Sequence, residues 1–341
     1  MRAPVSFVAS LVISVAVSAG AQARPLLAVG VEAGDVVLVD PAKAQVVERI
    51  KVGARARGLK VTRDRRRLLV AVAGPAKGAA APAAGSSGLA IIDIAARKVT
   101  KQIATPPAPF GVDLSLDGRT AFLSNSETNE ILVIDVGTGT VKKKIGIGTE
   151  PLEVATRPDG KAVYAAARAA NELSAIDPKT MASLARVDAG MRPRALVFAP
   201  RGNIAFAVNE AGPTITIVDT KQNVSKEMIV LQEPPRTTPA PTKTPGLSPQ
   251  SAVLSPDGKL LYVTTGPARS VLIVDPAKKA VVGVIDGVGW FPRGIAVSPD
   301  GKKLYTANGP SDDVAIIDIA SKKVEATVAV PGGPYSLVLI P

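Results

Sequence analysis

The feature that most constrains this chain is a repeat of about 42 residues that extends through nearly all of its 341 residues. In each copy an apolar segment ends in Ile-Asp or Val-Asp, and successive aspartates are 53, 42, 42, 42, 56 and 43 residues apart. Turns of the Asp-Gly type recur with the same two long intervals. Self-similarity at this period is typical of propellers and solenoids. The aspartates are Asp40, Asp93, Asp135, Asp177, Asp219, Asp275 and Asp318, and the turns lie at Asp64, Asp117, Asp159, Arg201, Asp257 and Asp300.

Each copy predicts four strands. In the clearest copy they cover residues 294–298, 303–307, 314–318 and 323–330, with Pro, Gly, Asn and Asp between them. The turn after the first strand is Pro-Asp-Gly, in which proline presets φ and glycine accepts a positive φ. The aspartate that ends each third strand is interpreted as a turn cap, because its carboxylate can accept the N–H groups that follow. Each copy is therefore a four-stranded antiparallel meander.

The two ends of the chain predict how many copies form the ring. Residues 336–341 match a first strand, and residues 27–29 precede Asp40 by the offset that separates Tyr305 from Asp318, so they match a second strand. The two ends together complete one unit beside six continuous ones. We therefore predict an all-β, seven-bladed β-propeller with four antiparallel strands per blade, closed by the C-terminal strand joining the N-terminal blade.

The amino end has the pattern of a targeting segment. A positive Met1-Arg2 start, an apolar run over 5–19 and small residues up to Ala23 predict a Sec signal peptide over 1–23, with the propeller domain over 24–341. This predicts a periplasmic or secreted protein. No later apolar run approaches the roughly 20 residues that a spanning helix needs, so no transmembrane segment is expected.

Composition narrows the chemistry, because the sequence has no histidine and no cysteine. These absences exclude a disulfide, a thiolate nucleophile, an imidazole base and the common zinc sites. We therefore expect no catalytic residues, no metal and no cofactor, in a protein that is not an enzyme. A hydrolase would have to rely on carboxylates or a lysine near the channel. The residues available for that are Glu127, Glu150, Glu153, Asp113 and Lys60.

Loop positions predict a binding face. Strand directions alternate within a blade, so the insertions over 74–88 and 233–250 project from the same face. The residue after the proline that precedes each first strand lies on that face, and arginines at such positions suit a carboxylate or phosphate. The alternative is that these are ordinary surface arginines, with aromatic side chains packing between blades. The predicted ligand-binding residues are Arg57, Phe110, Arg194, Trp290, Phe291, Arg293 and Tyr335, and Leu152 and Gln250 occupy the two remaining positions of this ring.

Oxygen-bearing loop residues on the same face are a weaker candidate for a hard cation such as calcium. They belong to separate blades, which argues against a shared site. These residues are Asn125, Glu127, Asn129, Asn209 and Glu210.

The second strands carry a resemblance to a known family. Residues 262–265, 305–308, 122–125 and 206–209 resemble the YVTN-type propeller repeat, and the string from Pro292 to Tyr305 matches it almost completely. The blades around Leu69 and Tyr164 depart from it, with Val72 and Ala167 where Asn is usual. The last two blades are similar to periplasmic YVTN propellers associated with pyrroloquinoline quinone-dependent alcohol oxidation. That resemblance implies the propeller fold and an accessory role.

Three hypotheses on function follow. The first is a non-catalytic periplasmic binding or scaffold protein, accessory to quinoprotein alcohol oxidation, acting as a monomer on a periplasmic protein or a small anionic ligand. The second is binding of single-stranded DNA or another polyanion at a basic channel mouth, in line with a net charge of +12. The third is a lactonase-like hydrolase.

Overall fold

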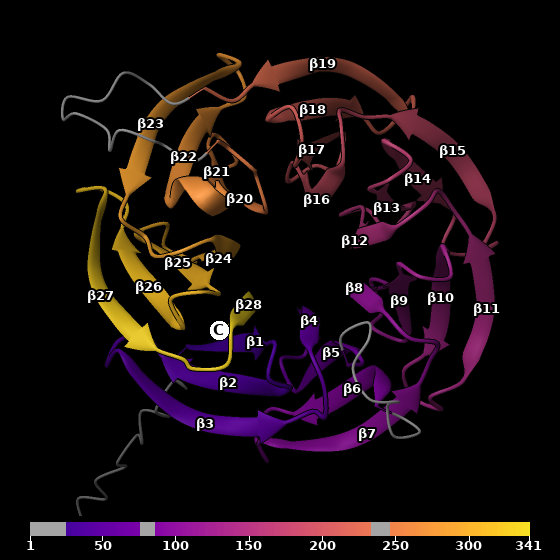
Figure 1. Ribbon diagram of the computed structural model, residues 1–341. Coiled ribbons are helices and arrows are strands. Elements are labelled where there is room, and N and C mark those ends of the chain that lie inside the picture. Colours follow the sequence, from indigo (N-terminus) through magenta and orange to yellow (C-terminus); the bar gives the residue numbers. More distant parts are fainter. Residues whose placement is uncertain (1–24, 76–85, 233–245) are drawn as a thin grey trace, which may run out of the picture.

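The computed structural model describes residues 25–75, 86–232 and 246–341, and these form a ring of seven four-stranded sheets around a central channel (Figure 1). The predicted seven-bladed β-propeller is confirmed. The only helix among the described residues is a single 3-10 turn, η1 (Gly266–Ala268), and no helix in those ranges is long and apolar enough to cross a membrane. The predicted signal peptide over 1–23 lies outside the described residues.

In every blade the first strand lies nearest the axis and the fourth forms the rim (Figure 1). We number the blades from the one that contains the amino-terminal strands. From the axis outward, blades 1 to 4 contain β28 (Pro334–Ile340), β1 (Leu26–Val31), β2 (Asp35–Asp40) and β3 (Gln45–Lys51); β4 (Ala56–Val61), β5 (Arg67–Ala73), β6 (Ser87–Asp93) and β7 (Lys98–Ala104); β8 (Pro109–Leu114), β9 (Thr120–Asn125), β10 (Glu130–Asp135) and β11 (Val141–Gly146); and β12 (Pro151–Thr156), β13 (Val163–Ala167), β14 (Glu172–Ile176) and β15 (Ser183–Asp188).

The other three blades follow the same order, and the short β20 borders the second insertion. Blades 5 to 7 contain β16 (Pro193–Phe198), β17 (Ile204–Asn209), β18 (Thr214–Asp219) and β19 (Val224–Val230); β20 (Ala252–Leu254), β21 (Leu261–Thr264), β22 (Ser270–Asp275) and β23 (Ala280–Asp286); and β24 (Pro292–Val297), β25 (Lys303–Asn308), β26 (Asp313–Asp318) and β27 (Lys323–Ala329).

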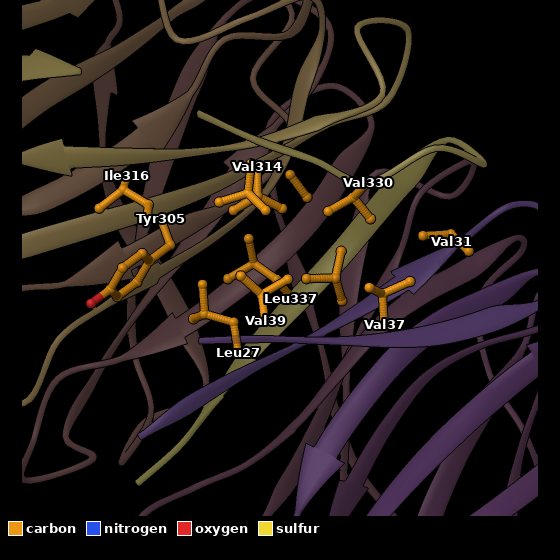
Figure 2. Close-up of a cluster of buried hydrophobic side chains, with 12 residues drawn as sticks. Leu27, Val31, Val37, Val39, Tyr305, Val314, Ile316, Val330 and Leu337 are labelled. Carbon is orange, nitrogen blue, oxygen red and sulfur yellow. The ribbon is translucent and has the colours of Figure 1, made fainter. Parts of the chain in front are cut away.

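The ring closes as the sequence predicts. The C-terminal strand β28 pairs antiparallel with β1, from Leu26 opposite Ile340 to Val31 opposite Pro334. Apolar side chains from both ends of the chain then pack against blade 7: Leu27 and Leu337 meet Tyr305 and Val314 in one buried cluster (Figure 2). Without β28, β1 would be the inner edge of a three-stranded blade, and the closing strand pairs that edge.

The hydrophobic core lies between blades, because each sheet is covered on both faces by its neighbours. The two middle strands of a blade are therefore mainly apolar and buried along most of their length, as in β9 and β10, whereas rim strands such as β11 are largely exposed. The repeated aspartates act as the predicted turn caps: Asp275, for example, accepts hydrogen bonds from the N–H groups of Ala277 and Lys278. Equivalent bonds hold the turns after the other six third strands.

Candidate active site in the channel

The residues after the prolines that recur in most blades point into the channel because the inner strands begin with a bulge. The pairing of β12 with β13 shifts between Pro151 and Val154, and β8, β16 and β24 shift at the same place. A bulge adds one residue to the strand and re-aims its side chains. The residue before the proline has a positive φ in several blades, as at Glu150 (φ 56°) and Phe291 (φ 54°). This local geometry directs one side chain per blade toward the axis.

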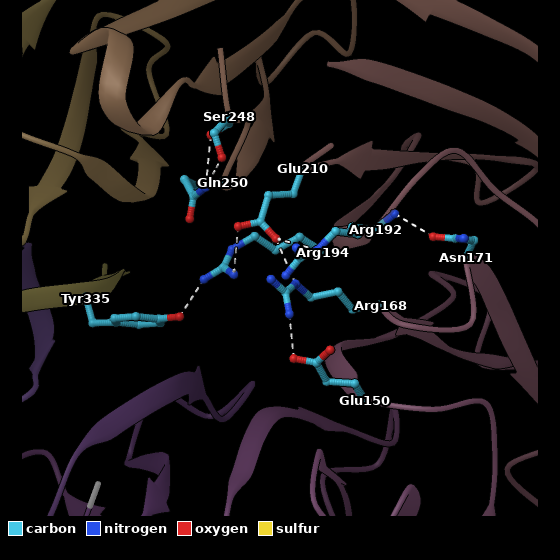
Figure 3. Close-up of polar contacts among 9 residues, drawn as sticks. All are labelled: Glu150, Arg168, Asn171, Arg192, Arg194, Glu210, Ser248, Gln250 and Tyr335. Atoms are coloured by element: carbon cyan, nitrogen blue, oxygen red, sulfur yellow. Dashed lines mark hydrogen bonds and ion pairs between the residues drawn. The ribbon is translucent and has the colours of Figure 1, made fainter. Parts of the chain in front are cut away.

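Five of the seven predicted ligand-binding residues meet around the Tyr335 ring. The guanidinium carbons of Arg57, Arg293 and Arg194 lie 3.9, 4.8 and 5.9 Å from the ring centroid. Arg194 also donates a hydrogen bond of 2.5 Å to the Tyr335 hydroxyl (Figure 3). Phe110 packs edge-on against Tyr335 with centroids 5.9 Å apart. We call these five residues the tyrosine cluster: Arg57, Phe110, Arg194, Arg293 and Tyr335.

The other two predicted residues lie farther out. Phe291 stacks on Arg293, with the guanidinium carbon 4.6 Å from its ring centroid. Trp290 is 56% exposed, stacks with Arg269 at 4.2 Å, and lines neither of the two cavities described below. Trp290 is therefore separate from the tyrosine cluster, and its role in ligand binding stays a prediction. The backbone turns at Phe291, where φ is 54°, and the Trp290 side chain before this turn is exposed.

The tyrosine cluster separates two cavities along the channel, since its five residues line both. The outer cavity, of about 300 Å³, lies at the end of the channel where second strands lead into third strands, and Glu32, Ser126 and Arg168 contribute to its lining. The inner cavity, of about 200 Å³, lies deeper between the inner strands. Volumes of this size suit a small molecule rather than a macromolecule.

Carboxylates neutralise much of the positive charge at the outer cavity. Arg57 pairs with Glu32 at 2.5 Å. Arg168 pairs with Glu150 at 2.5 Å and with Glu210 at 2.7 Å (Figure 3). Burial opposes the charge on Arg168, but its hydrogen bonds to Glu210 and Glu150 outweigh burial and raise its pKa. The mouth is therefore an organised ion-pair network.

Arg293 differs from the other cluster arginines because it forms no ion pair within the described residues. Burial lowers the pKa of Arg293, and the positive charges of Arg194 and Arg57 lower it further. Tyr335 and Glu32 have the opposite effect and raise it. A half-buried guanidinium without a carboxylate partner retains donors for an anion or a carbonyl oxygen.

Two arginines of the outer cavity were missed by the sequence analysis. Arg55 donates to the carbonyl oxygens of Gly74 and Pro75 at 2.8 and 3.0 Å, so the base of the first insertion reaches the mouth. Arg168 follows Ala167, where the repeat departs from its usual Asn. That departure was the signal in the sequence that could have identified Arg168.

The inner cavity contains a carboxyl group and two buried oxygens without partners. Burial raises the pKa of Glu153 to about 7; Asp113 adds to this, while Lys60 and Arg194 oppose it. Gln250 is 3% exposed, and its amide nitrogen donates to Ser248, which leaves its oxygen directed into the channel (Figure 3). That oxygen and the Ser336 hydroxyl have no hydrogen-bond partner among the described residues. Polar groups buried in this way are satisfied by a ligand or by water.

The loop residues considered for calcium are used in other ways. Asn125 accepts the N–H groups of Glu127 and Thr128, Asn129 accepts that of Glu150, and Glu210 binds arginine. Within the described ranges, no group of three or more acidic side chains is arranged to hold a metal ion.

Part of the chain that forms this site matches a known protein family. Residues 175–333, a little under half of the chain, match the family model described as lactonase, 7-bladed beta-propeller. This match contradicts the expectation that the protein is not an enzyme, since it points to a hydrolase. The expectation failed because the lack of histidine removes one kind of base, whereas carboxyl and guanidinium groups still provide acid–base and electrostatic chemistry.

Similar solved structures include several propellers. The Pseudomonas aeruginosa periplasmic gluconolactonase is 22% identical, with a TM-score of 0.74 over 93% of this chain and 99% of that one. A 6-phosphogluconolactonase candidate from Bacteroides uniformis is 18% identical, with a TM-score of 0.71 over 92% and 98%. Kuenenia stuttgartiensis hydrazine synthase is 20% identical, with a TM-score of 0.69 over 82% and 88%. These similarities show the shared fold. No match is found among curated proteins.

Proposed function

We propose that this protein hydrolyses a small lactone in the propeller channel. The observation that carries the proposal is the position of Glu153 in a cavity bordered by arginines and Tyr335, in a chain whose residues 175–333 match the lactonase propeller model. A base is most effective when its pKa lies near the working pH, and burial raises that of Glu153 to about 7. The carboxylates at the outer cavity are instead engaged by guanidinium groups.

In the proposed reaction, the Glu153 carboxylate takes a proton from a water molecule as the water oxygen attacks the lactone carbonyl carbon. Negative charge develops on the carbonyl oxygen, and a guanidinium of the tyrosine cluster stabilises it. The ring C–O bond then breaks, and Glu153 returns its proton to the departing oxygen. The product is a hydroxy acid that loses one proton to solvent at neutral pH.

The unpartnered amide oxygen of Gln250 supports a hydroxylated substrate. It is directed into the channel, where it can accept a hydrogen bond from a substrate hydroxyl (Figure 3). A site with buried polar groups discriminates strongly against an analogue that leaves them unpaired. We therefore propose a sugar-type lactone as the substrate class.

The test compares glucono-δ-lactone with δ-valerolactone, which has the same six-membered ring without hydroxyl groups. Product formation is followed by proton NMR with the purified protein and, as the blank, with buffer alone. We expect hydrolysis of the hydroxylated lactone well above the spontaneous rate, with kcat/KM at least about 100-fold above that for δ-valerolactone. Rates equal to the blank across a panel of lactones would overturn the proposal.

Export remains a proposal as well. The pattern over residues 1–23 supports periplasmic location, and one structural neighbour is described as a periplasmic lactonase. An association with quinoprotein alcohol oxidation rests on the sequence resemblance of the last two blades.

A further inference from the structure

The inner strands have a second polar region, which lies where β4, β8 and β12 end and the turns to the second strands begin. A cavity of about 180 Å³ there is lined by Lys60, Arg63, Asp113 and Thr156, among others. None of its lining residues belongs to the inner cavity that contains Glu153. The Lys60 side chain is 42% exposed and that of Asp113 is 8% exposed, so the pair connects the protein interior with solvent at this end of the inner strands.

Lys60 and Asp113 are bound to each other and to the strand that carries Glu153. The Lys60 ammonium lies 2.6 Å from the Asp113 carboxylate. The other Asp113 oxygen accepts a hydrogen bond of 2.7 Å from the N–H of Thr156, at the end of β12. Lys60, Asp113 and Glu153 thus occupy three consecutive inner strands, β4, β8 and β12.

The repeat shows that these charges are exceptions. We count from the residue just before the channel-facing position of each inner strand, which is Ala56 in blade 2 and Pro109 in blade 3. Four residues later, five blades have alanine or valine, whereas blade 2 has Lys60 and blade 3 has Asp113. Two residues after the same starting point, Glu153 is the only ionisable side chain among the seven blades. A largely buried carboxylate costs free energy unless it is paired. The residues at the fourth position are Lys60, Asp113, Ala155, Val197, Val253, Ala296 and Val338, and those at the second are Gly58, Gly111, Glu153, Ala195, Ser251, Gly294 and Ser336.

The charges that act on Glu153 come from three directions. Asp113 and Lys60 act from β8 and β4, and Arg194 acts from β16 on the opposite side of β12. Arg57 and Arg293 line the same cavity. Asp113 disfavours the ionised form of Glu153, while Lys60 and Arg194 favour it.

We propose that Lys60 and Asp113 are positioning residues that set the protonation state of Glu153 from the ends of neighbouring inner strands. Their opposite charges act in opposite directions on one carboxyl group, so the balance between them fixes the pH range in which Glu153 is a base. The inference rests on the proposed function for its catalytic meaning, but the electrostatic coupling itself does not require turnover.

The test uses the full chain with ¹³C-labelled glutamate, and follows the Glu153 side-chain carbonyl by NMR as pH is varied. The resonance is assigned by its absence in Glu153→Gln. Asp113→Asn should move the midpoint down and Lys60→Met should move it up, each by about one unit. The double variant should lie near the wild type. Lys279→Met is the matched control, since it removes a lysine from an ion pair of 2.5 Å with Glu227 on the rim.

Equal midpoints in all variants, or shifts of the same sign in both single variants, would overturn the inference. In Asp113→Asn the asparagine can still accept a hydrogen bond from the Thr156 N–H, and in Lys60→Met the methionine has nearly the length of lysine. If Asp113→Asn does not fold, the upward shift of the Glu153 midpoint in Lys60→Met tests the inference alone. The midpoint of the pH–rate profile for lactone hydrolysis should move with the NMR midpoint. Opposite NMR shifts without lactone turnover would contradict the proposed function and leave the coupling intact.

Discussion

The middle strands of each blade and the strands that line the channel differ in what the repeat requires of them. The middle strands β9 and β10 are buried along nearly their whole length, and similar apolar sequences fill the equivalent strands of other blades. The inner strands β4 and β12 are partly open and differ in charge from blade to blade. Stability therefore resides mainly in what the blades share, and the candidate chemistry resides in the positions where they differ.

The largest expected effect on stability comes from a middle strand. Leu132 lies in β10 and is fully buried in a cluster shared by blades 2 and 3. Leu132→Ala should lower the free energy of unfolding by about 2–5 kcal/mol, because it leaves a cavity in a close-packed core. Urea denaturation measures this loss, and lactone turnover per folded molecule should stay at the wild-type value. A loss of turnover in the folded variant would contradict the claim that the middle strands provide stability while the inner strands provide the chemistry.

A smaller loss of stability is expected from a substitution where two inner strands approach closely. A Cβ at Gly111 in β8 would lie 2.5 Å from the Leu152 carbonyl oxygen of β12. Gly111→Ala should cost about 1–3 kcal/mol of stability and reduce turnover, since it separates β8 from the strand that carries Glu153. The control is Gly146→Ala in the rim strand β11, where a Cβ would meet no atom within 4 Å. Equal stability and turnover in both variants would show that the spacing of inner strands does not matter.

The regular part of the molecule could be predicted from the sequence. The constant spacing of Asp135, Asp177 and Asp219 reflects one blade per repeat, and the strand offsets before Asp40 and Asp318 were sufficient to predict how the ring closes. These features follow from local turn chemistry and from apolar patterning, both of which depend on residues that are close together in the sequence.

The site could be predicted only in part. Tyr335 and its arginines occupy the same position of the repeat, which follows a proline in most blades and Ala56 in blade 2, so their convergence could be anticipated from that position. Arg168 lies in a loop, and the direction of a loop side chain is not encoded by the spacing. Glu153 appeared in the sequence as one carboxylate among several. What distinguishes it is its half-buried place among neighbouring inner strands at the cavity, and that depends on the packing of blades against each other.

The most direct test of the account is the pH dependence of lactone hydrolysis in the wild type, Glu153→Gln and Glu227→Gln. Glu227 lies on the rim strand β19, so its variant removes a carboxylate outside the channel. We expect kcat/KM of the wild type to rise as pH passes through about 7, because Glu153 must lose its proton to act as a base. Glu153→Gln should lose about 100- to 10,000-fold and Glu227→Gln should match the wild type. Full activity in a folded Glu153→Gln protein would contradict the assignment of the base.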